Sequence, residues 1–244
     1  MVTQKTLLKF QQDGFLHIPA LLQPSQLKVL SNLYGECLST FFALDDNAKL
    51  QHGMASFGTT WIYRPEALVP ALSDCTVADV ITEHARGLLD SSSLDVGFRI
   101  FHKPPLIGDS TPWHQDEAYQ SPDYLHHSLN CWLPLQDVSP ATGALRYIPG
   151  PVHSAVVEHE AAHDSITNGL RISAVEVDES RAVDVSMRAG DAVFHHCRTL
   201  HSSHCNRSVR ARQSMVVVCS APKVRVDRPT ARPWLEQLGQ RYTA

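Results

Sequence analysis

The chain has 244 residues, of which 43% are hydrophobic, and a formal net charge of −4, which suits one mid-sized domain with a substantial core. Its charges are dispersed without a basic stripe, which argues against a nucleic-acid partner, and no apolar run is long enough to span a membrane. The first residues lack a signal-peptide layout and the six cysteines show no CxxC spacing, so we expect a cytoplasmic protein with reduced thiols, present as a monomer or homodimer.

Three helices are predicted in the first part of the chain, over residues 3–12, 24–44 and about 76–90. The second helix has one apolar face, which predicts packing against a core. The residues of that face are Leu27, Leu30, Leu33, Tyr34, Cys37, Leu38 and Phe41.

From Leu94 onward, short strand candidates alternate with turns rich in Gly, Pro and Asp. This alternation is typical of a double-sheet jelly roll. We therefore predict a mainly β protein, a double-stranded β-helix (jelly-roll) barrel buttressed by N-terminal and flanking α-helices. The single domain of residues 1–244 would comprise a mostly helical buttress (1–93), the jelly-roll core (94–220) and a peripheral tail (221–244).

The most informative motif is His114-Gln115-Asp116, in a short predicted strand after a loop rich in Pro and Gly. In a strand, residues i and i+2 share a face, so the imidazole and the carboxylate would project to the same side. Chance alone predicts about one such pair among 14 histidines and 25 acids, so a histidine beside an unrelated Asp is the alternative. With a second histidine, the pair would hold iron(II) on one face and leave positions open for a co-substrate and O₂.

The second histidine should lie on a different strand. Residues 190–195 predict a turn and a strand that enters the core. Residues 199–219 predict a hairpin with its tip near Asn206-Arg207. His201 and Arg212 lie at equal distances from this tip, so they would be cross-strand partners that point to one face.

Three other histidines compete with His201 for the remaining ligand position. His195 lies deeper in the predicted core, His196 has the opposite strand parity, and His204 is near the bend. Each is better explained as a packed or surface histidine. His201 is favoured because it alone pairs with a candidate anion anchor.

That anchor is Arg212, since an arginine that faces a barrel interior is costly unless an anion meets it. The planar guanidinium suits a carboxylate. Arg212 is therefore predicted to bind the far carboxylate of a dicarboxylic keto acid whose other end chelates the metal, and Ser203 would donate a further hydrogen bond to that carboxylate. An ordinary salt bridge is the alternative for Arg212. Arg210 is a rival candidate for the anchor, because it would point to the same face of the strand.

Taken together, these segments resemble the phytanoyl-CoA dioxygenase family of iron(II)- and 2-oxoglutarate-dependent oxygenases. The likeness covers most of the chain and depends on the order and spacing of its pieces. The matching segments are residues 10–19, 101–105, 113–116, 130–132, 143–150, 190–195 and 201–203, with Asn206 and Arg212.

The resemblance implies a role for seven residues. They are the iron ligands His114, Asp116 and His201, the 2-oxoglutarate anchors Arg212 and Ser203, and two further co-substrate contacts, Trp132 and Arg99. The chain departs from the family pattern at His153, which stands one position later than usual after a Pro-Gly turn, and at Ser202, which replaces a glycine. The presence of Asp116 argues against the related halogenases, which have a small residue there.

The predicted function is that of an iron(II)- and 2-oxoglutarate-dependent dioxygenase that hydroxylates an unactivated C–H bond of a small molecule, with release of succinate and CO₂. The chain has no evident cluster for CoA phosphates, so we expect a natural-product intermediate or an amino-acid-like metabolite as substrate. Two alternatives stay open: a cupin-like metal-dependent dioxygenase or metal-binding protein that does not use 2-oxoglutarate, and a degenerate scaffold protein.

Overall fold

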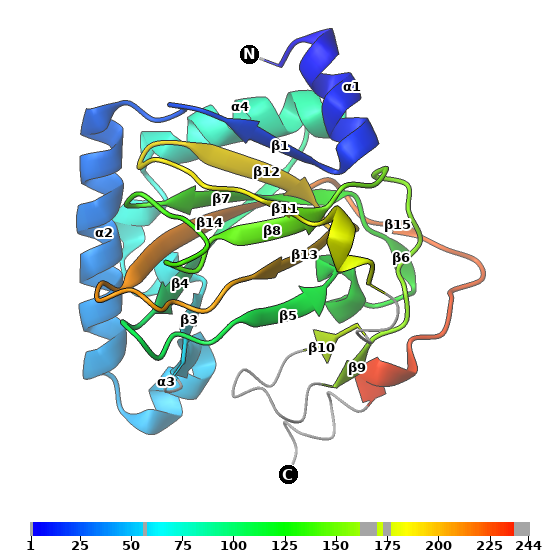
Figure 1. The fold of residues 1–244 in the computed structure, drawn as a ribbon. Coiled ribbons are helices and arrows are strands. Elements are labelled where there is room, and N and C mark those ends of the chain that lie inside the picture. Colours follow the sequence, from blue (N-terminus) through cyan, green and yellow to red (C-terminus); the bar gives the residue numbers. More distant parts are fainter. Residues whose placement is uncertain (1, 56–57, 162–169, 173–176, 237–244) are drawn as a thin grey trace.

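The computed structural model describes residues 2–55, 58–161, 170–172 and 177–236. Most of its helical structure precedes the long strands (Figure 1). The helices are α1 (Gln4–Asp13), α2 (Pro24–Ala43), α3 (Asp46–His52) and α4 (Thr76–Leu89), with short 3₁₀ turns η1 (Pro65–Ala67), η2 (Pro70–Leu72), η3 (Asp116–Tyr119) and η5 (Glu179–Arg181). The three predicted helices agree with α1, α2 and α4 to within one residue, whereas α3 was not predicted. No helix in the described ranges combines the length and apolarity that a bilayer crossing requires.

The local sequence explains where the first two helices begin and end. The Thr3 hydroxyl caps α1 by accepting a hydrogen bond from the backbone N–H of Thr6, and Pro24 occupies the first turn of α2, where its missing N–H costs nothing. Gly14 ends α1 with φ of +80°, a conformation that favours glycine. A Cβ on Gly14 would also lie 2.6 Å from Thr199 Oγ1, so the position is closed to larger residues.

The β structure of the described residues consists of two main antiparallel sheets and two short strand pairs. The large sheet has the order β1-β12-β7-β14-β4-β3-β2, and the small sheet has the order β11-β8-β13-β5. The strands of the large sheet are β1 (Phe15–Ile18), β2 (Gly53–Ala55), β3 (Thr60–Tyr63), β4 (Asp95–Lys103), β7 (Ser128–Pro134), β12 (Ala192–His196) and β14 (Arg212–Ser220). Those of the small sheet are β5 (Thr111–His114), β8 (Leu145–Ile148), β11 (Val183–Asp184) and β13 (Leu200–Ser203). The short pairs are β9 (Glu160–Ala161) with β10 (Leu170–Arg171), and β6 (Tyr124–Leu125) with β15 (Val224–Arg225).

The helices cover the outer face of the large sheet. Figure 1 shows α2 and α4 alongside its strands. The largest hydrophobic core joins Leu30 of α2 and Ile81 of α4 to Ile100, Cys131 and Met215 of the sheet. Burial of these side chains, at about 25 cal/mol per Å² of apolar surface, stabilises the docking of the helices.

A second core lies between the two sheets. It joins Trp132, Val193 and Val216 of the large sheet to Leu145 and Tyr147 of the small sheet. The interior face of each strand is therefore the face opposite to the helices, as the alternation of side chains along a strand requires. The fold is the predicted mainly β jelly-roll type with helices on one side.

The predicted hairpin between His201 and Arg212 is wrong. β13 lies in the small sheet between β8 and β5, and β14 lies in the large sheet between β7 and β4. The connecting loop is held by the buried Asn206, whose Nδ2 donates to three backbone carbonyls at 2.7 to 3.2 Å. The chain thus crosses from one sheet to the other, and His201 and Arg212 reach the interior from opposite sheets.

Candidate metal centre

Three of the predicted residues come together in the interior at the end of β5. His114 and His201 are cross-strand partners on β5 and β13, and their ring centroids lie 4.1 Å apart. Asp116 Oδ1 lies 3.7 Å from His114 Nε2 and 3.9 Å from His201 Nε2. One ligand atom from each residue lies within 4.8 Å of the others, which is the spacing that a single bound cation requires.

The two histidine rings are oriented by backbone carbonyls. His114 Nδ1 lies 2.8 Å from the Pro112 carbonyl, and His201 Nδ1 lies 2.9 Å from the Thr199 carbonyl. A carbonyl accepts only, so each Nδ1 carries the proton and each Nε2 presents a lone pair toward Asp116. Burial lowers the pKa of both His114 and His201 to about 4, so both rings are neutral at pH 7 and able to bind a metal.

Asp116 reaches the histidines from a turn rather than from within a strand. β5 ends at His114, Gln115 keeps an extended backbone, and Asp116 begins η3. The predicted i, i+2 relation therefore holds through Gln115. The Gln115 side chain points the other way and donates to the carbonyls of Ala155 and Arg198 at 3.0 and 2.7 Å.

The Asp116 carboxylate is ionised and supported on its second oxygen. Burial would raise the pKa of Asp116, but the surrounding His201, His195 and His114 outweigh it and hold the pKa well below its usual range. Oδ2 accepts a 2.7 Å hydrogen bond from Asn130 Nδ2 and lies 3.3 Å from His195 Nε2. Two neutral imidazoles and one carboxylate are the donor set that suits ferrous iron, so the residues fit this metal.

Arg212 is a buried cation without a carboxylate partner in the described part of the chain. Only 2% of its surface is exposed. Its Nη1 donates to Ser214 Oγ at 3.0 Å, and its Nε is buried without an acceptor. The guanidinium also lies 5.5 Å from the Trp132 ring centroid. Burial lowers the pKa of Arg212 to about 10, which leaves it charged at pH 7, whereas the rival Arg210 is exposed.

The salt-bridge alternative for Arg212 is not supported, because no carboxylate of the described residues pairs with it. One cavity of about 70 Å³ is lined both by the three metal-site residues and by Arg212. All seven residues that the sequence singled out line this cavity: Arg99, His114, Asp116, Trp132, His201, Ser203 and Arg212. An unpaired donor on a buried guanidinium that lines the same cavity as the candidate metal ligands fits the far carboxylate of a keto acid.

Ser203 lies in this cavity wall, but its hydroxyl is already engaged. It donates to Thr111 Oγ1 at 2.8 Å and accepts from Lys103 Nζ at 2.7 Å. Because Thr111 lines the same cavity, the Ser203–Thr111 pair presents one hydroxyl chain to a bound carboxylate. Lys103 is fully buried and also donates to the backbone carbonyls of Asp109 and His204.

The three rival histidines lie in different surroundings, and none belongs to the three-residue set of His114, Asp116 and His201. His196 turns to the outer face, where its Nε2 lies 3.4 Å from His127 Nδ1. His204 forms a 2.6 Å pair with Asp184. His195 lines the cavity but stands behind the Asp116 carboxylate and is not part of the three-residue set.

The turn that carries Asp116 is clamped from outside by Glu117, which is 1% exposed. Glu117 pairs with Arg198 at 2.6 Å and with Arg232 at 2.9 Å. Burial would raise the pKa of Glu117, but the two arginines hold it below its usual range. Trp234 donates from its indole to the Ala118 carbonyl at 2.9 Å. The segment expected to be a peripheral tail thus contacts the turn beside a candidate ligand.

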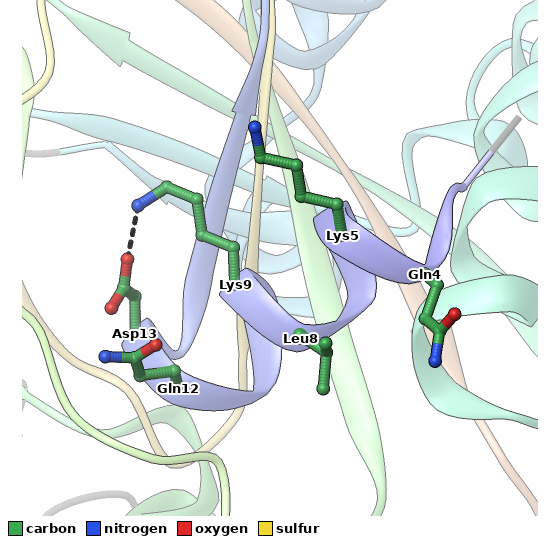
Figure 2. Close-up of a pocket in the computed structure, with 6 residues that line it drawn as sticks. All are labelled: Gln4, Lys5, Leu8, Lys9, Gln12 and Asp13. Carbon is green, nitrogen blue, oxygen red and sulfur yellow. Dashed lines mark hydrogen bonds and ion pairs between the residues drawn. The ribbon is translucent and has the colours of Figure 1, made fainter.

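Two hollows outside the interior offer no comparable chemistry. One lies along the exposed side of α1 (Figure 2) and is lined by Gln4, Lys5, Leu8, Lys9, Gln12 and Asp13. All its residues come from one helix, and Lys9 pairs with Asp13 at 2.5 Å. The other lies outside the small sheet, where Arg146 pairs with Glu179 at 2.9 Å. Each hollow thus contains an ion pair formed within the chain.

Sequence reasoning assigned no supporting role in the site to four residues that shape it. They are Asn130, His195, Thr111 and Lys103. Asn130 and Lys103 lie on strands that the family resemblance had marked, so their position was available, but a strand pattern alone does not show which distant side chain each one meets.

Comparison with known proteins agrees with this site. The family model for phytanoyl-CoA dioxygenase (PhyH) matches residues 10–214. The chain is 23% identical over 221 residues to a probable alpha-ketoglutarate-dependent hypophosphite dioxygenase of Stutzerimonas stutzeri, which covers 86% of this chain and 75% of that protein. It is 28% identical over 161 residues to L-proline trans-4-hydroxylase of Streptomyces griseoviridis, over 57% of this chain and 58% of the relative.

A solved structure with the same fold is that of EvdO2 from Micromonospora carbonacea var. aurantiaca, complexed with 2-oxoglutarate. It superimposes with a TM-score of 0.81 and 26% identity over 96% of this chain and 97% of that chain. The similarity therefore includes both the helical buttress and the two sheets.

Proposed function

The chain belongs to the phytanoyl-CoA dioxygenase family, and on this premise we propose that it hydroxylates an unactivated C–H bond of a small molecule. It is an iron(II)- and 2-oxoglutarate-dependent dioxygenase, so its reaction consumes O₂ and 2-oxoglutarate and releases succinate and CO₂. The observation that supports the proposal most strongly is the single cavity that joins His114, Asp116 and His201 to the unpaired Arg212.

In this proposal His114, Asp116 and His201 hold the iron. When bound there, ferrous iron and its co-substrate supply the oxidising chemistry that the side chains of a protein lack. The chain contributes a prearranged ligand set, because backbone carbonyls already fix both imidazoles. It also restricts water, because His114 and His201 are 8% and 5% exposed.

Arg212 binds the far carboxylate of 2-oxoglutarate in the proposed complex. Its Nε supplies a donor that no group in the described residues uses. The Ser203–Thr111 hydroxyl pair contributes a further donor once a carboxylate arrives. Trp132 and Arg99 form part of the same wall and are proposed to contact the co-substrate as well.

The substrate is proposed to be a natural-product intermediate or an amino-acid-like metabolite. One similar protein supports this class, because it is named as L-proline trans-4-hydroxylase. The arginines among the residues that line the cavity are the half-exposed Arg99 and the buried Arg212, which do not form a cluster suited to several phosphates. This composition favours a compact substrate over an acyl-CoA thioester.

The test is anaerobic loading of the purified chain with iron(II), followed by O₂ in the presence and absence of 2-oxoglutarate. Oxygen uptake and succinate formation are measured together, with a panel of amino acids and natural-product precursors as candidate substrates. We expect equimolar O₂ uptake and succinate formation that increase with a true substrate. Asp116→Ala serves as the inactive control.

Oxygen uptake that proceeds equally well without 2-oxoglutarate would favour the cupin-like alternative instead. A chain that binds no iron(II) under anaerobic conditions would favour the scaffold alternative. Either result contradicts the proposal.

A further inference from the structure

The two oxygens of the Asp116 carboxylate meet different surroundings. Oδ1 faces the Nε2 atoms of His114 and His201, at 3.7 and 3.9 Å. Oδ2 points the other way, to Asn130 Nδ2 at 2.7 Å and His195 Nε2 at 3.3 Å. One oxygen is thus left for a metal, while protein donors surround the other.

The two groups that face Oδ2 come from the opposite sheet. Asn130 on β7 and His195 on β12 are direct cross-strand partners in the large sheet, whereas His114 and His201 belong to the small sheet. Neighbouring positions on adjacent strands point to one face, so both side chains approach the same oxygen. The carboxylate therefore lies between ligands from one sheet and donors from the other.

The tautomer of His195 follows from its two neighbours. Its Nδ1 lies 3.0 Å from the Tyr147 hydroxyl. Its buried Nε2 forms no hydrogen bond with the described residues but lies 3.3 Å from Asp116 Oδ2. A carboxylate accepts only, so a favourable contact needs the proton on Nε2, and Nδ1 must then accept from Tyr147. The Tyr147 ring is held by stacking on Phe15, with centroids 4.4 Å apart, which fixes its hydroxyl in place.

We propose that His195 is a positioning residue that, with Asn130, holds Asp116 Oδ2 away from the metal and so presents Oδ1 alone to the iron. Tyr147 fixes the His195 tautomer that this role requires. The proposal rests on the iron site of the proposed function. His195 is not a fourth ligand here, because its Nε2 faces the oxygen that the other two imidazoles do not.

The test uses Co(II) as the metal probe, so that it does not depend on turnover. Co(II) is titrated calorimetrically into the metal-free chain, and the visible spectrum of the loaded protein is recorded. Loss of an outer hydrogen bond to a metal ligand typically weakens metal binding 10–100-fold. We expect His195→Leu to weaken Co(II) binding by about this factor and to change the spectrum.

Two further variants and one matched control sharpen the result. His195→Gln keeps a donor near the Nε2 position and should recover most of the affinity. Tyr147→Phe keeps the ring stack on Phe15 but frees the tautomer, so it should weaken binding several-fold even if His195→Leu fails to fold. His196→Leu is the control, because His196 is an equally buried neighbour on the outer face and should bind Co(II) as the wild type does.

Several results would overturn the proposal while leaving the iron site intact. Wild-type affinity and spectrum in His195→Leu and Tyr147→Phe would show that His195 and Tyr147 have no effect on Asp116. Loss of Co(II) binding in His195→Gln as severe as in His195→Leu would make His195 a ligand instead. If the wild-type chain itself binds no Co(II), the proposed function fails and not merely this inference.

Discussion

Replacement of Arg212 by methionine should separate co-substrate binding from fold stability. The side chain is 2% exposed. Its Nη1 donates to Ser214 Oγ, and its Nε has no acceptor among the described residues. Hydrogen bonds to charged groups contribute about 1.5–3 kcal/mol each. A two-bond grip on a carboxylate is therefore worth about 3 kcal/mol at the low end, which corresponds to an increase of about 100-fold in the Kd for 2-oxoglutarate.

The same change should not weaken the metal-free fold. Methionine removes a buried cation that lacks a carboxylate partner among the described residues and lies near a second buried cation, Lys103. Replacement of buried charge by a well-packed apolar side chain is often neutral or stabilising. We therefore expect the free energy of unfolding of the metal-free Arg212→Met variant to equal or exceed that of the wild type.

The assay is calorimetric titration of 2-oxoglutarate into the anaerobic, iron(II)-loaded chain, paired with urea unfolding of the metal-free chain. Arg210→Met is the matched control, since Arg210 is exposed and should leave both quantities unchanged. An Arg212→Met variant that binds 2-oxoglutarate with wild-type affinity would refute the anchor assignment. A metal-free Arg212→Met variant that is clearly less stable would show that the arginine is a structural residue.

The remaining predictions concern the metal, one buried carboxylate and the C-terminal segment. Asp116→Ala should reduce succinate formation by more than the roughly 10–100-fold that is typical when a residue supporting a metal ligand is replaced, and the circular dichroism spectrum should not change. Normal turnover would exclude Asp116 as a ligand. Mn(II) with 2-oxoglutarate at about 100 times its Kd should raise the free energy of unfolding by about 2.7 kcal/mol, and a chelator should reverse this; no shift would mean no site. Asp191→Asn should lower the free energy of unfolding at pH 7 by about 1–2 kcal/mol, because the carboxylate accepts from the backbone of Ala20 and Arg188 at 2.8 and 2.9 Å. Burial would raise the pKa of Asp191, but these bonds hold it below its usual value. The stability that the ionised Asp191 contributes is therefore present above about pH 4 and is lost as the pH falls through the lower folded pKa. A difference in the free energy of unfolding between variant and wild type that stays constant down to about pH 3 would contradict this. Trp234→Ala should lower the free energy of unfolding by about 3 kcal/mol and weaken Co(II) binding several-fold, and unchanged values of both would show that the segment does not support the turn.

Local periodicity was enough to place α2, because the apolar stripe of a helix is set by residues three or four positions apart. The pair His114 and Asp116 was likewise visible, since two residues in extended backbone share a side wherever the strand lies. His201 was selected for a reason that the structure overturns. It is paired with His114 across β5 and β13 rather than with Arg212.

The strand order was beyond the sequence pattern because it depends on contacts between distant segments. Nothing in the alternation of residues 199–219 distinguishes a hairpin from a crossover, and the choice depends on the buried Asn206, which anchors the loop to three carbonyls. The support of Asp116 by Asn130 and His195 was hidden for the same reason. Their roles arise only when β7 and β12 become neighbours.

The contact between Glu117 and Arg232 has a consequence for the order in which the protein matures. Every candidate ligand leaves the ribosome before residue 232 does, yet the turn beside Asp116 gains its second arginine only when Arg232 arrives. A nascent chain that has exposed both sheets therefore still lacks one clamp of its metal-binding turn. Capture of the cation should therefore tighten once Arg232 has emerged and paired with Glu117.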